Sequence, residues 1–413
     1  MRLSTTMLKG MLVFVLAMLV CSMASAAGKW AVTASLQGVY LINSSQGNTT
    51  STLVSDFTGA SLSGVAVVGS YVFVADTAGS SDSNPRLLHV GQLQNLDTSP
   101  SIKWFQYSYD NTSSNGIKLQ NGSNVLRSPG AVVSDSNGGI YILGARWYDS
   151  GNNSHCNYAY IAPNSDWSAL PTVQIADIPT ASFADIATTD SGALIARKDY
   201  SGSGWADQSW VSAVSAGTVG SNSLPDDGGY YPRAIAVGSN GLAYMANAST
   251  EVTSGAGPVD IGSISVLSSS SLAKASDAAI QLGDFRPTDI AFFTVGGVSY
   301  LGLVGTSASE GAEALRFALD NNGIPDISSK TKVNLGTSTS HYCTVSSDGL
   351  TFWVSSSQAN TVSMIETSSW TLHSIQMTAP TGYIASYVPE PSSLMALLTA
   401  VCGLALAKRK RRA

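Results

Sequence analysis

Charged side chains are scarce in this sequence of 413 residues, since Asp, Glu, Lys and Arg together make up 12% of it. Long helices usually expose many Glu, Lys and Arg side chains, so this composition argues against a mainly helical protein. Histidine and cysteine are also rare, with four residues each, and no CxxC pair or zinc-ligand spacing occurs. Gly, Ser, Thr and Asn are abundant, and between them lie short runs of Val, Ile, Tyr, Phe and Trp. That pattern predicts an all-β protein.

Long apolar runs are missing from the body of the chain and occur at its two ends. Two basic residues precede the apolar run 11–21, and Ala24 and Ala26 supply small residues for cleavage. This is the layout of a secretory signal peptide. We therefore expect residues 1–26 to be removed by signal peptidase.

The C-terminal end has three parts in a fixed order. Pro389, Glu390 and Pro391 form a rigid motif that interrupts secondary structure. An uncharged apolar run over 394–407 follows, and it is shorter than the about 20 residues that a permanent membrane anchor needs. The chain then ends in the basic cluster Lys408, Arg409, Lys410, Arg411 and Arg412. The segment 389–413 resembles the PEP-CTERM sorting signal of Gram-negative bacteria, with a plain tail anchor as the alternative. The resemblance implies a short transmembrane helix, processing by an exosortase, a transient stay in the inner membrane, and deployment at the cell surface or in the extracellular matrix.

The remaining chain is acidic. Without residues 1–26 and 392–413, it has 14 basic residues against 27 acidic ones, a net charge of −13. Nucleic-acid binding depends on Lys and Arg that neutralise phosphates, so we expect no nucleic-acid partner.

The sequence leaves open whether the protein has a disulfide and whether it binds a structural calcium ion. Cys156 and Cys343 either form a disulfide, which an exported protein permits, or remain separate thiols. No metal site is predicted from the ligand spacing. A structural calcium ion using Asp135, Asp149 or Asp227 stays an alternative, although no loop has the spacing of an EF-hand.

One pattern recurs six times: an apolar strand, a turn with Gly, and a second apolar strand. The second strands open near Tyr71, Ile140, Ala193, Leu242, Val298 and Leu350, at intervals of 49 to 69 residues. This period is typical of four-stranded propeller blades with variable loops. In three of the units the turn contains Asn-Gly or Asp-Gly, which predicts a tight hairpin with positive φ.

A seventh unit is divided between the two ends of the body. Residues 29–57 supply three strands without an inner one, and 379–388 supply a spare apolar strand. We expect the two segments to pair and close the ring, because closure removes exposed sheet edges. Residues 27–388 are thus predicted to form a seven-bladed β-propeller, with six blades or a pair of sandwiches as alternatives.

The last complete unit supports this architecture. Phe352-Trp353-Val354 and the run 360–367 resemble the YVTN repeat of secreted propellers, and other units are more loosely YVTN/NHL-like. Ser355 and Ser356 replace the Thr-Asn of that repeat. The resemblance implies a seven-bladed propeller and no particular activity.

Two loops after second strands are rich in aromatic and charged residues, which suit contacts with a polysaccharide or a surface protein. The predicted ligand contacts are Arg146, Trp147, Tyr148, Asp149, Arg197, Asp199, Tyr200 and Trp205. A binding or structural role without catalysis is the main interpretation. Alternatively, the aromatic side chains only pack within their own loops, and the charged ones are solvated.

An enzymatic role is the second interpretation. Some seven-bladed propellers, such as the lactonase group, open sugar lactones, and a hydrolase or lyase of this kind needs acids, His or Arg that converge at the channel. No GxSxG elbow supports serine catalysis, and no catalytic residue is assigned. His341 precedes an expected inner strand, so one interpretation places it at the central channel; the alternative is an exposed or hydrogen-bonded loop histidine.

Overall fold

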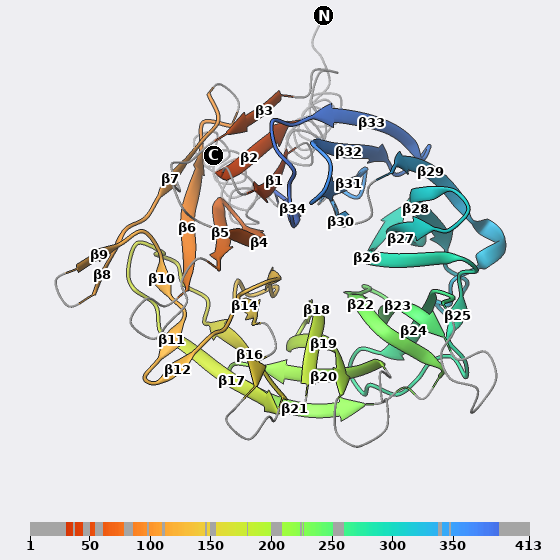
Figure 1. Cartoon of the computed structure of the whole chain (residues 1–413), viewed down its shortest axis with the longest axis horizontal. Coiled ribbons are helices and arrows are strands. Elements are labelled where there is room, and N and C mark those ends of the chain that lie inside the picture. Colours follow the sequence, from red (N-terminus) through yellow and green to blue (C-terminus); the bar gives the residue numbers. More distant parts are fainter. Residues whose placement is uncertain are drawn as a thin grey trace, which may run out of the picture.

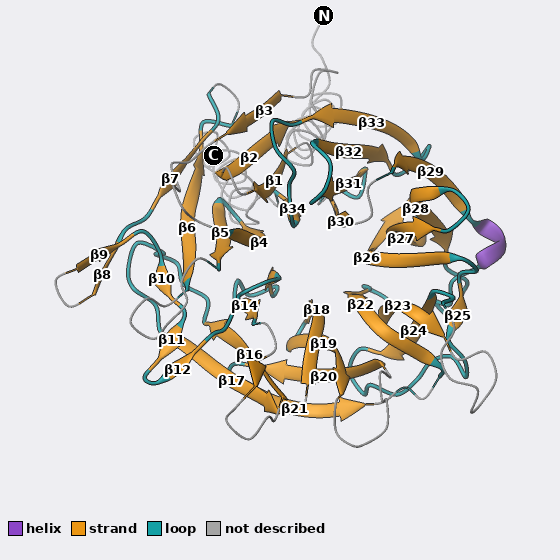
Figure 2. Ribbon diagram, in the orientation of Figure 1, coloured by secondary structure: helices purple, strands orange, loops and turns teal. Residues whose placement is uncertain are grey.

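The computed structural model describes residues 30–387 except for 36–37, 44–49, 54–60, 78–85, 97–98, 110–111, 145–146, 149–153, 180, 200–208, 224, 226, 251–259, 338–340 and 347. This part of the chain forms seven antiparallel blades around a common centre (Figure 1). Apart from a 3-10 turn at Ile327–Ser329, the described elements are strands (Figure 2). The predicted all-β, seven-bladed propeller is confirmed, and the alternatives with six blades or two sandwiches are wrong.

Each blade begins at the centre and proceeds outward. The inner strands, in order around the ring, are β34 (Ile384–Ser386), β4 (Leu62–Val68), β13 (Val132–Ser134), β18 (Ala181–Thr189), β22 (Gly229–Val237), β26 (Phe285–Val295) and β30 (His341–Val345). Their partners are β1 (Trp30–Ser35), β5 (Tyr71–Asp76), β14 (Ile140–Leu143), β19 (Gly192–Asp199), β23 (Leu242–Thr250), β27 (Val298–Ser307) and β31 (Thr351–Ser356). The observed starts of these second strands agree with the predicted ones to within one residue.

The outer half of each blade holds the remaining strands. The third strands are β2 (Gly38–Asn43), β6 (Leu87–Gln94), β16 (Ser154–Ile161), β20 (Ser209–Ser215), β24 (Ser263–Ser268), β28 (Gly311–Ala318) and β32 (Thr361–Glu366). The outermost are β3 (Thr50–Leu53), β7 (Ser101–Trp104), β10 (Ile117–Lys118), β15 (Trp147–Tyr148), β17 (Val173–Pro179), β21 (Thr218–Ser223), β25 (Ile280–Gln281), β29 (Thr331–Gly336) and β33 (Thr371–Gln376). Two small hairpins complete the set: β8 (Tyr107–Tyr109) with β9 (Thr112–Ser114), and β11 (Gln120–Asn121) with β12 (Asn124–Val125).

The ring closes where the two ends of the body meet. The closing strand β34 pairs with β1 in antiparallel register, with Thr33 opposite Ile384. The Thr33 hydroxyl also donates a hydrogen bond of 2.9 Å to the carbonyl oxygen of Tyr383. The predicted pairing of segment 379–388 with the N-terminal strands is therefore confirmed.

The Gly-containing turns differ from the prediction in detail. Gly138, Gly241 and Gly349 have φ values of +88°, +79° and +70°, as expected, but the Asn or Asp before each of them does not. The loops are four or five residues long rather than two, so they are not primed two-residue hairpins. In one of them the Asp135 carboxylate accepts the N–H of Gly139 at 2.8 Å.

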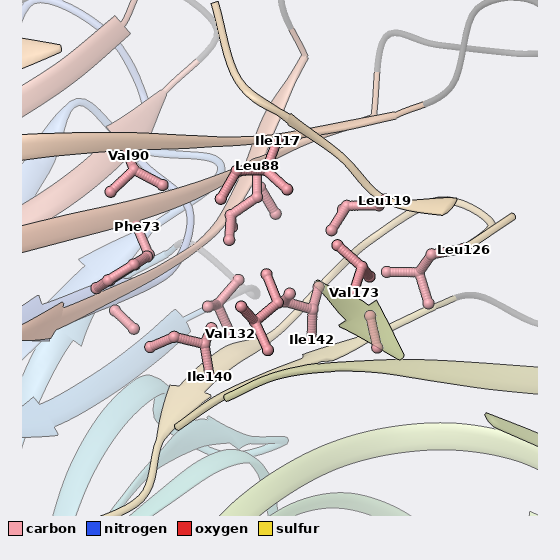
Figure 3. Packing of buried hydrophobic residues seen from close by; sticks show 14 of the residues in the cluster. Phe73, Leu88, Val90, Ile117, Leu119, Leu126, Val132, Ile140, Ile142 and Val173 are labelled. Atoms are coloured by element: carbon pink, nitrogen blue, oxygen red, sulfur yellow. The ribbon is translucent and has the colours of Figure 1, made fainter. Parts of the chain in front are cut away.

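Apolar side chains fill the spaces between adjacent blades. Figure 3 shows Phe73 and Leu88 of one blade meeting Val132, Ile140 and Ile142 of the next. All five side chains are buried, and similar clusters separate other blades. This packing holds the inner strands in fixed positions, and those strands form the site described next.

Candidate functional site

A pocket of about 650 Å³ opens at the end of the ring where the inner strands begin. Its walls come from β18, β22, β26 and β30, and from Tyr383 just before the closing strand. We call it the central pocket. The side chains relevant to chemistry are those of Arg233, Arg286, His341 and Tyr342.

Three consecutive inner strands carry a β-bulge at this pocket. The extra, unpaired residues are Ala184 in β18, Arg233 in β22 and Thr288 in β26. All three line the pocket. A bulge bends its strand and re-aims the local side chains, so the same irregularity shapes three sides of the site.

His341 is the most unusual side chain in the pocket wall. It is 4% exposed, and its Nδ1 atom is buried with no hydrogen-bond partner among the described residues. Burial lowers its pKa to about 4, so the imidazole is neutral at neutral pH and able to accept a proton. Its backbone is fixed by the bulge of the neighbouring blade, because the Thr288 hydroxyl donates to the carbonyl oxygen of His341 at 3.1 Å.

Two arginines supply positive charge. Arg233 is exposed and has no hydrogen-bond or ion-pair partner within the described chain. Arg286 forms an ion pair with Asp260, with 2.5 Å between Nη2 and Oδ2. Both members of that pair are about half exposed or more, so the interaction contributes little to stability. The guanidinium groups are therefore available to an anionic or strongly polar ligand.

Two carboxylates follow the bulges and connect neighbouring blades. Asp185 accepts the N–H of Ile235 at 3.1 Å, and Asp289 accepts that of Cys343 at 2.7 Å. Burial raises the pKa of both carboxyl groups, to about 7 for Asp289, and the charge of Asp289 raises the pKa of Asp185 further. These acids bridge the inner strands and place titratable groups at the centre of the ring.

Tyr342 of β30 and Tyr383, which precedes the closing strand, form an aromatic wall. The rings of Tyr342 and Tyr383 lie 4.2 Å apart at 37°, and both line the central pocket. Burial is the main cause that raises the pKa of each phenol. The pocket is therefore complete only when the ring is closed.

The structure describes only some of the predicted ligand contacts. Trp147 and Tyr148 form β15, which pairs with the start of β16, and Asp199 ends β19. Arg197 is 4% exposed; its guanidinium lies over the Trp210 ring at 5.2 Å, and its Nε donates to Ser212 at 2.6 Å. Arg197 is thus part of the blade interior rather than of an exposed loop surface. Residues Arg146, Asp149, Tyr200 and Trp205 lie outside the described chain.

Cys156 and Cys343 form no disulfide with each other, so the disulfide alternative is wrong. Cys156 in β16 donates to the carbonyl oxygen of Ala181 at 3.0 Å, whereas Cys343 lies in β30 of a different blade. Within the described residues, no group of three or more His, Cys, Asp and Glu side chains is arranged to hold a metal ion. Of the calcium candidates, Asp135 and Asp227 accept backbone N–H groups, and Asp149 is not described.

The targeting predictions concern the undescribed ends of the chain. Ala24, Ala26, Pro389, Glu390 and Pro391 lie there, as does the terminal basic cluster. No helix between residues 30 and 387, as far as this range is described, has the length and apolar character needed to cross a membrane.

Sequence reasoning missed Arg233 and Arg286 as site residues. A signal was present, since Phe183–Ile186, Pro232–Ile235 and Pro287–Ile290 align as inner-strand openings. In that alignment Arg233 occupies the bulge position and Asp185 and Asp289 follow it. The bulge is difficult to predict from the sequence, because it inserts a single residue into an otherwise regular apolar strand.

Comparison with known proteins gives the fold. The sequence matches no protein-family model and no curated protein sequence. The structure is similar to the periplasmic gluconolactonase of Pseudomonas aeruginosa, at 11% identity over 86% of this chain and 98% of that one, with a TM-score of 0.55. It is also similar to a putative 6-phosphogluconolactonase from Bacteroides uniformis, at 15% identity over 86% and 98% of the two chains, with a TM-score of 0.51. At these identities the comparisons establish a shared architecture, and this chain is a seven-bladed β-propeller.

Proposed function

We propose that the protein hydrolyses a sugar lactone in the central pocket. The observation that carries this proposal is the convergence of a buried, neutral His341 with Arg233 and Arg286 around one cavity. Groups of this kind at the centre distinguish a catalytic propeller from one that only binds through exposed aromatic loops. The enzymatic alternative from the sequence is therefore preferred over a purely binding or structural role. Two propellers whose names describe them as lactonases, one of them putative, share the architecture, which is consistent with the proposal.

The chemistry requires one base and one stabilised oxyanion. Neutral His341 accepts a proton from water as the water oxygen bonds to the lactone carbonyl carbon. The guanidinium groups of Arg233 and Arg286 stabilise the negative charge that develops on the carbonyl oxygen. The bond from that carbon to the ring oxygen then breaks, the ring oxygen takes the proton from the imidazolium, and a hydroxy acid leaves. Water and lactone are the only reactants.

The test compares matched histidine variants of the full-length chain. His341→Gln should lower kcat/KM for glucono-δ-lactone by about 10²- to 10⁴-fold, because it removes the base. His373→Gln is the control, since the His373 side chain is 47% exposed on the outer strand β33 and pairs with Glu366. Rates are followed by acid release, with spontaneous hydrolysis subtracted. Equal rates for wild type and His341→Gln, at equal thermal stability, would reject the proposal.

We also propose export followed by C-terminal sorting, on the sequence of the two ends. Tyr387, the last described residue, follows the closing strand directly, and the proposed sorting segment 389–413 comes next in the sequence. Intact mass and fractionation should show loss of roughly 22 to 25 C-terminal residues in wild type. The variant Pro389→Ala/Pro391→Ala should keep its tail and stay in the inner membrane. An uncut tail in both proteins would mean a plain anchor.

A further inference from the structure

The sequence contains five Asn-Gly pairs, and the structure describes all of them. In such a pair the backbone nitrogen of the Gly can attack the Asn side chain, because Gly has no Cβ that hinders the approach. The pairs are Asn115-Gly116, Asn121-Gly122, Asn137-Gly138, Asn240-Gly241 and Asn322-Gly323. Whether a pair reacts in the folded protein depends on whether the Gly nitrogen is free and the Asn side chain can reach it.

In four of the pairs a hydrogen bond already holds the Gly N–H. The amides of Gly138, Gly241 and Gly323 each donate to the backbone carbonyl oxygen three residues earlier, at 3.0 to 3.1 Å. Gly116 is buried, and its N–H donates to the Ser114 hydroxyl at 3.4 Å. These nitrogens must lose a hydrogen bond before they can attack, which slows the reaction.

Asn121-Gly122 is the exception, at both of its positions. The pair lies at the turn of the β11–β12 hairpin, in which Asn121 is opposite Asn124. Gly122 has a φ of +59°, as the first central residue of a type II′ turn requires, so its N–H takes no part in the ladder. Within the described chain neither this N–H nor the Asn121 side chain has a hydrogen-bond partner, and both residues are exposed. The attacking nitrogen and its target are therefore both free.

The hairpin also has room to open locally. Figure 1 places β11 and β12 at the rim of the ring, and among the described strands they pair only with each other. A two-stranded hairpin of this kind is marginally stable. Apart from the chain neighbours of Gly122, no heavy atom lies within 4 Å of the point that a Cβ there would occupy. Local opening therefore lets Asn121 adopt backbone conformations in which its Cγ meets the Gly122 nitrogen.

We infer that Asn121 is a site of spontaneous modification, at which the side-chain amide is lost as ammonia. The Gly122 nitrogen bonds to Cγ of Asn121, the bond from Cγ to Nδ2 breaks, and the Gly122 proton leaves with the ammonia. The product is a cyclic imide. Water then opens this ring at either carbonyl carbon, which gives aspartate or isoaspartate and adds one negative charge to the hairpin. Water is the only co-reactant, and the step is independent of the proposed lactone hydrolysis.

Peptide mapping by mass spectrometry tests this site on the full-length chain. The protein is incubated at mildly alkaline pH, either folded or in urea, and amide loss is followed at every Asn-Gly pair. In the folded chain Asn121 should convert roughly tenfold faster than the other four asparagines, about the protection that one hydrogen bond supplies. In urea all the pairs should convert at similar rates, because each Asn is followed by the same residue. Asn121→Gln is the control variant, and it should remove the fast phase of ammonia release from the folded chain.

The two incubations separate the effect of the fold from that of the local sequence. A lead of Asn121 that is present in the folded chain and absent in urea would support the inference. Equal rates at Asn121 and at the other asparagines of the folded chain would overturn it. So would a lead that persists in urea, because the selectivity would then come from the neighbouring residues rather than from the structure.

Discussion

Ending the chain after Gly382 should open the ring and lower the free energy of unfolding by about 5 kcal/mol or more. The deletion removes β34 and so exposes the edge of β1. It also removes Ile384, which is 6% exposed and packs with Ala31 and Trp353. Loss of a buried Ile costs several kcal/mol, and the lost backbone hydrogen bonds add to it. Exposed strand edges pair with other chains, so association should accompany the loss of stability.

A chain that ends after Tyr387 is the matched control. It keeps β34, the Tyr342–Tyr383 ring contact and the hydrogen bond from Ser386 to Val345. Both shortened chains lack residues 388–413, so the difference between them reports residues 383–387 alone. Urea unfolding and light scattering measure stability and association. Equal unfolding midpoints for the two chains would mean that the closing strand does not hold the ring together.

The architecture was readable from the sequence because each blade repeats a local signal. Turn residues, apolar alternation and a period near 50 residues recur, and they depend on neighbours in the chain. Ring closure was predictable for a different reason: residues 29–57 lacked an inner strand and 379–388 offered one. Both inferences needed only the pattern of apolar residues, which burial in a propeller enforces directly.

The site was harder to predict from the sequence than the fold, because its residues come from several different blades. Arg233 and Arg286 come from different inner strands, and the bulge in β22 makes Arg233 a pocket residue. The burial that lowers the pKa of His341 also comes from tertiary packing. By contrast, Arg197 was predicted as a ligand contact on an exposed loop, but it lies in β19 and is buried. Successive residues of a strand point to opposite faces, and the Arg197 side chain points into the blade.

The pH dependence of catalysis should be set by His341. Its pKa is lowered to about 4, so the imidazole is protonated, and inactive as a base, below that pH. We expect kcat/KM for lactone hydrolysis to rise by about tenfold per pH unit up to about pH 4 and then stay level to neutral pH. Asp289 would behave differently as the base. Its pKa is raised to about 7, so activity would rise through neutral pH instead.

The most direct measurement is therefore the pH profile of kcat/KM for glucono-δ-lactone between about pH 3 and pH 7.5, in wild type and in His341→Gln. We expect a wild-type profile that levels off near pH 4, and a variant with low activity and no inflection there. A wild-type inflection near pH 7, or hydrolysis no faster than the uncatalysed reaction at every pH, would contradict a catalytic role for His341 as the base.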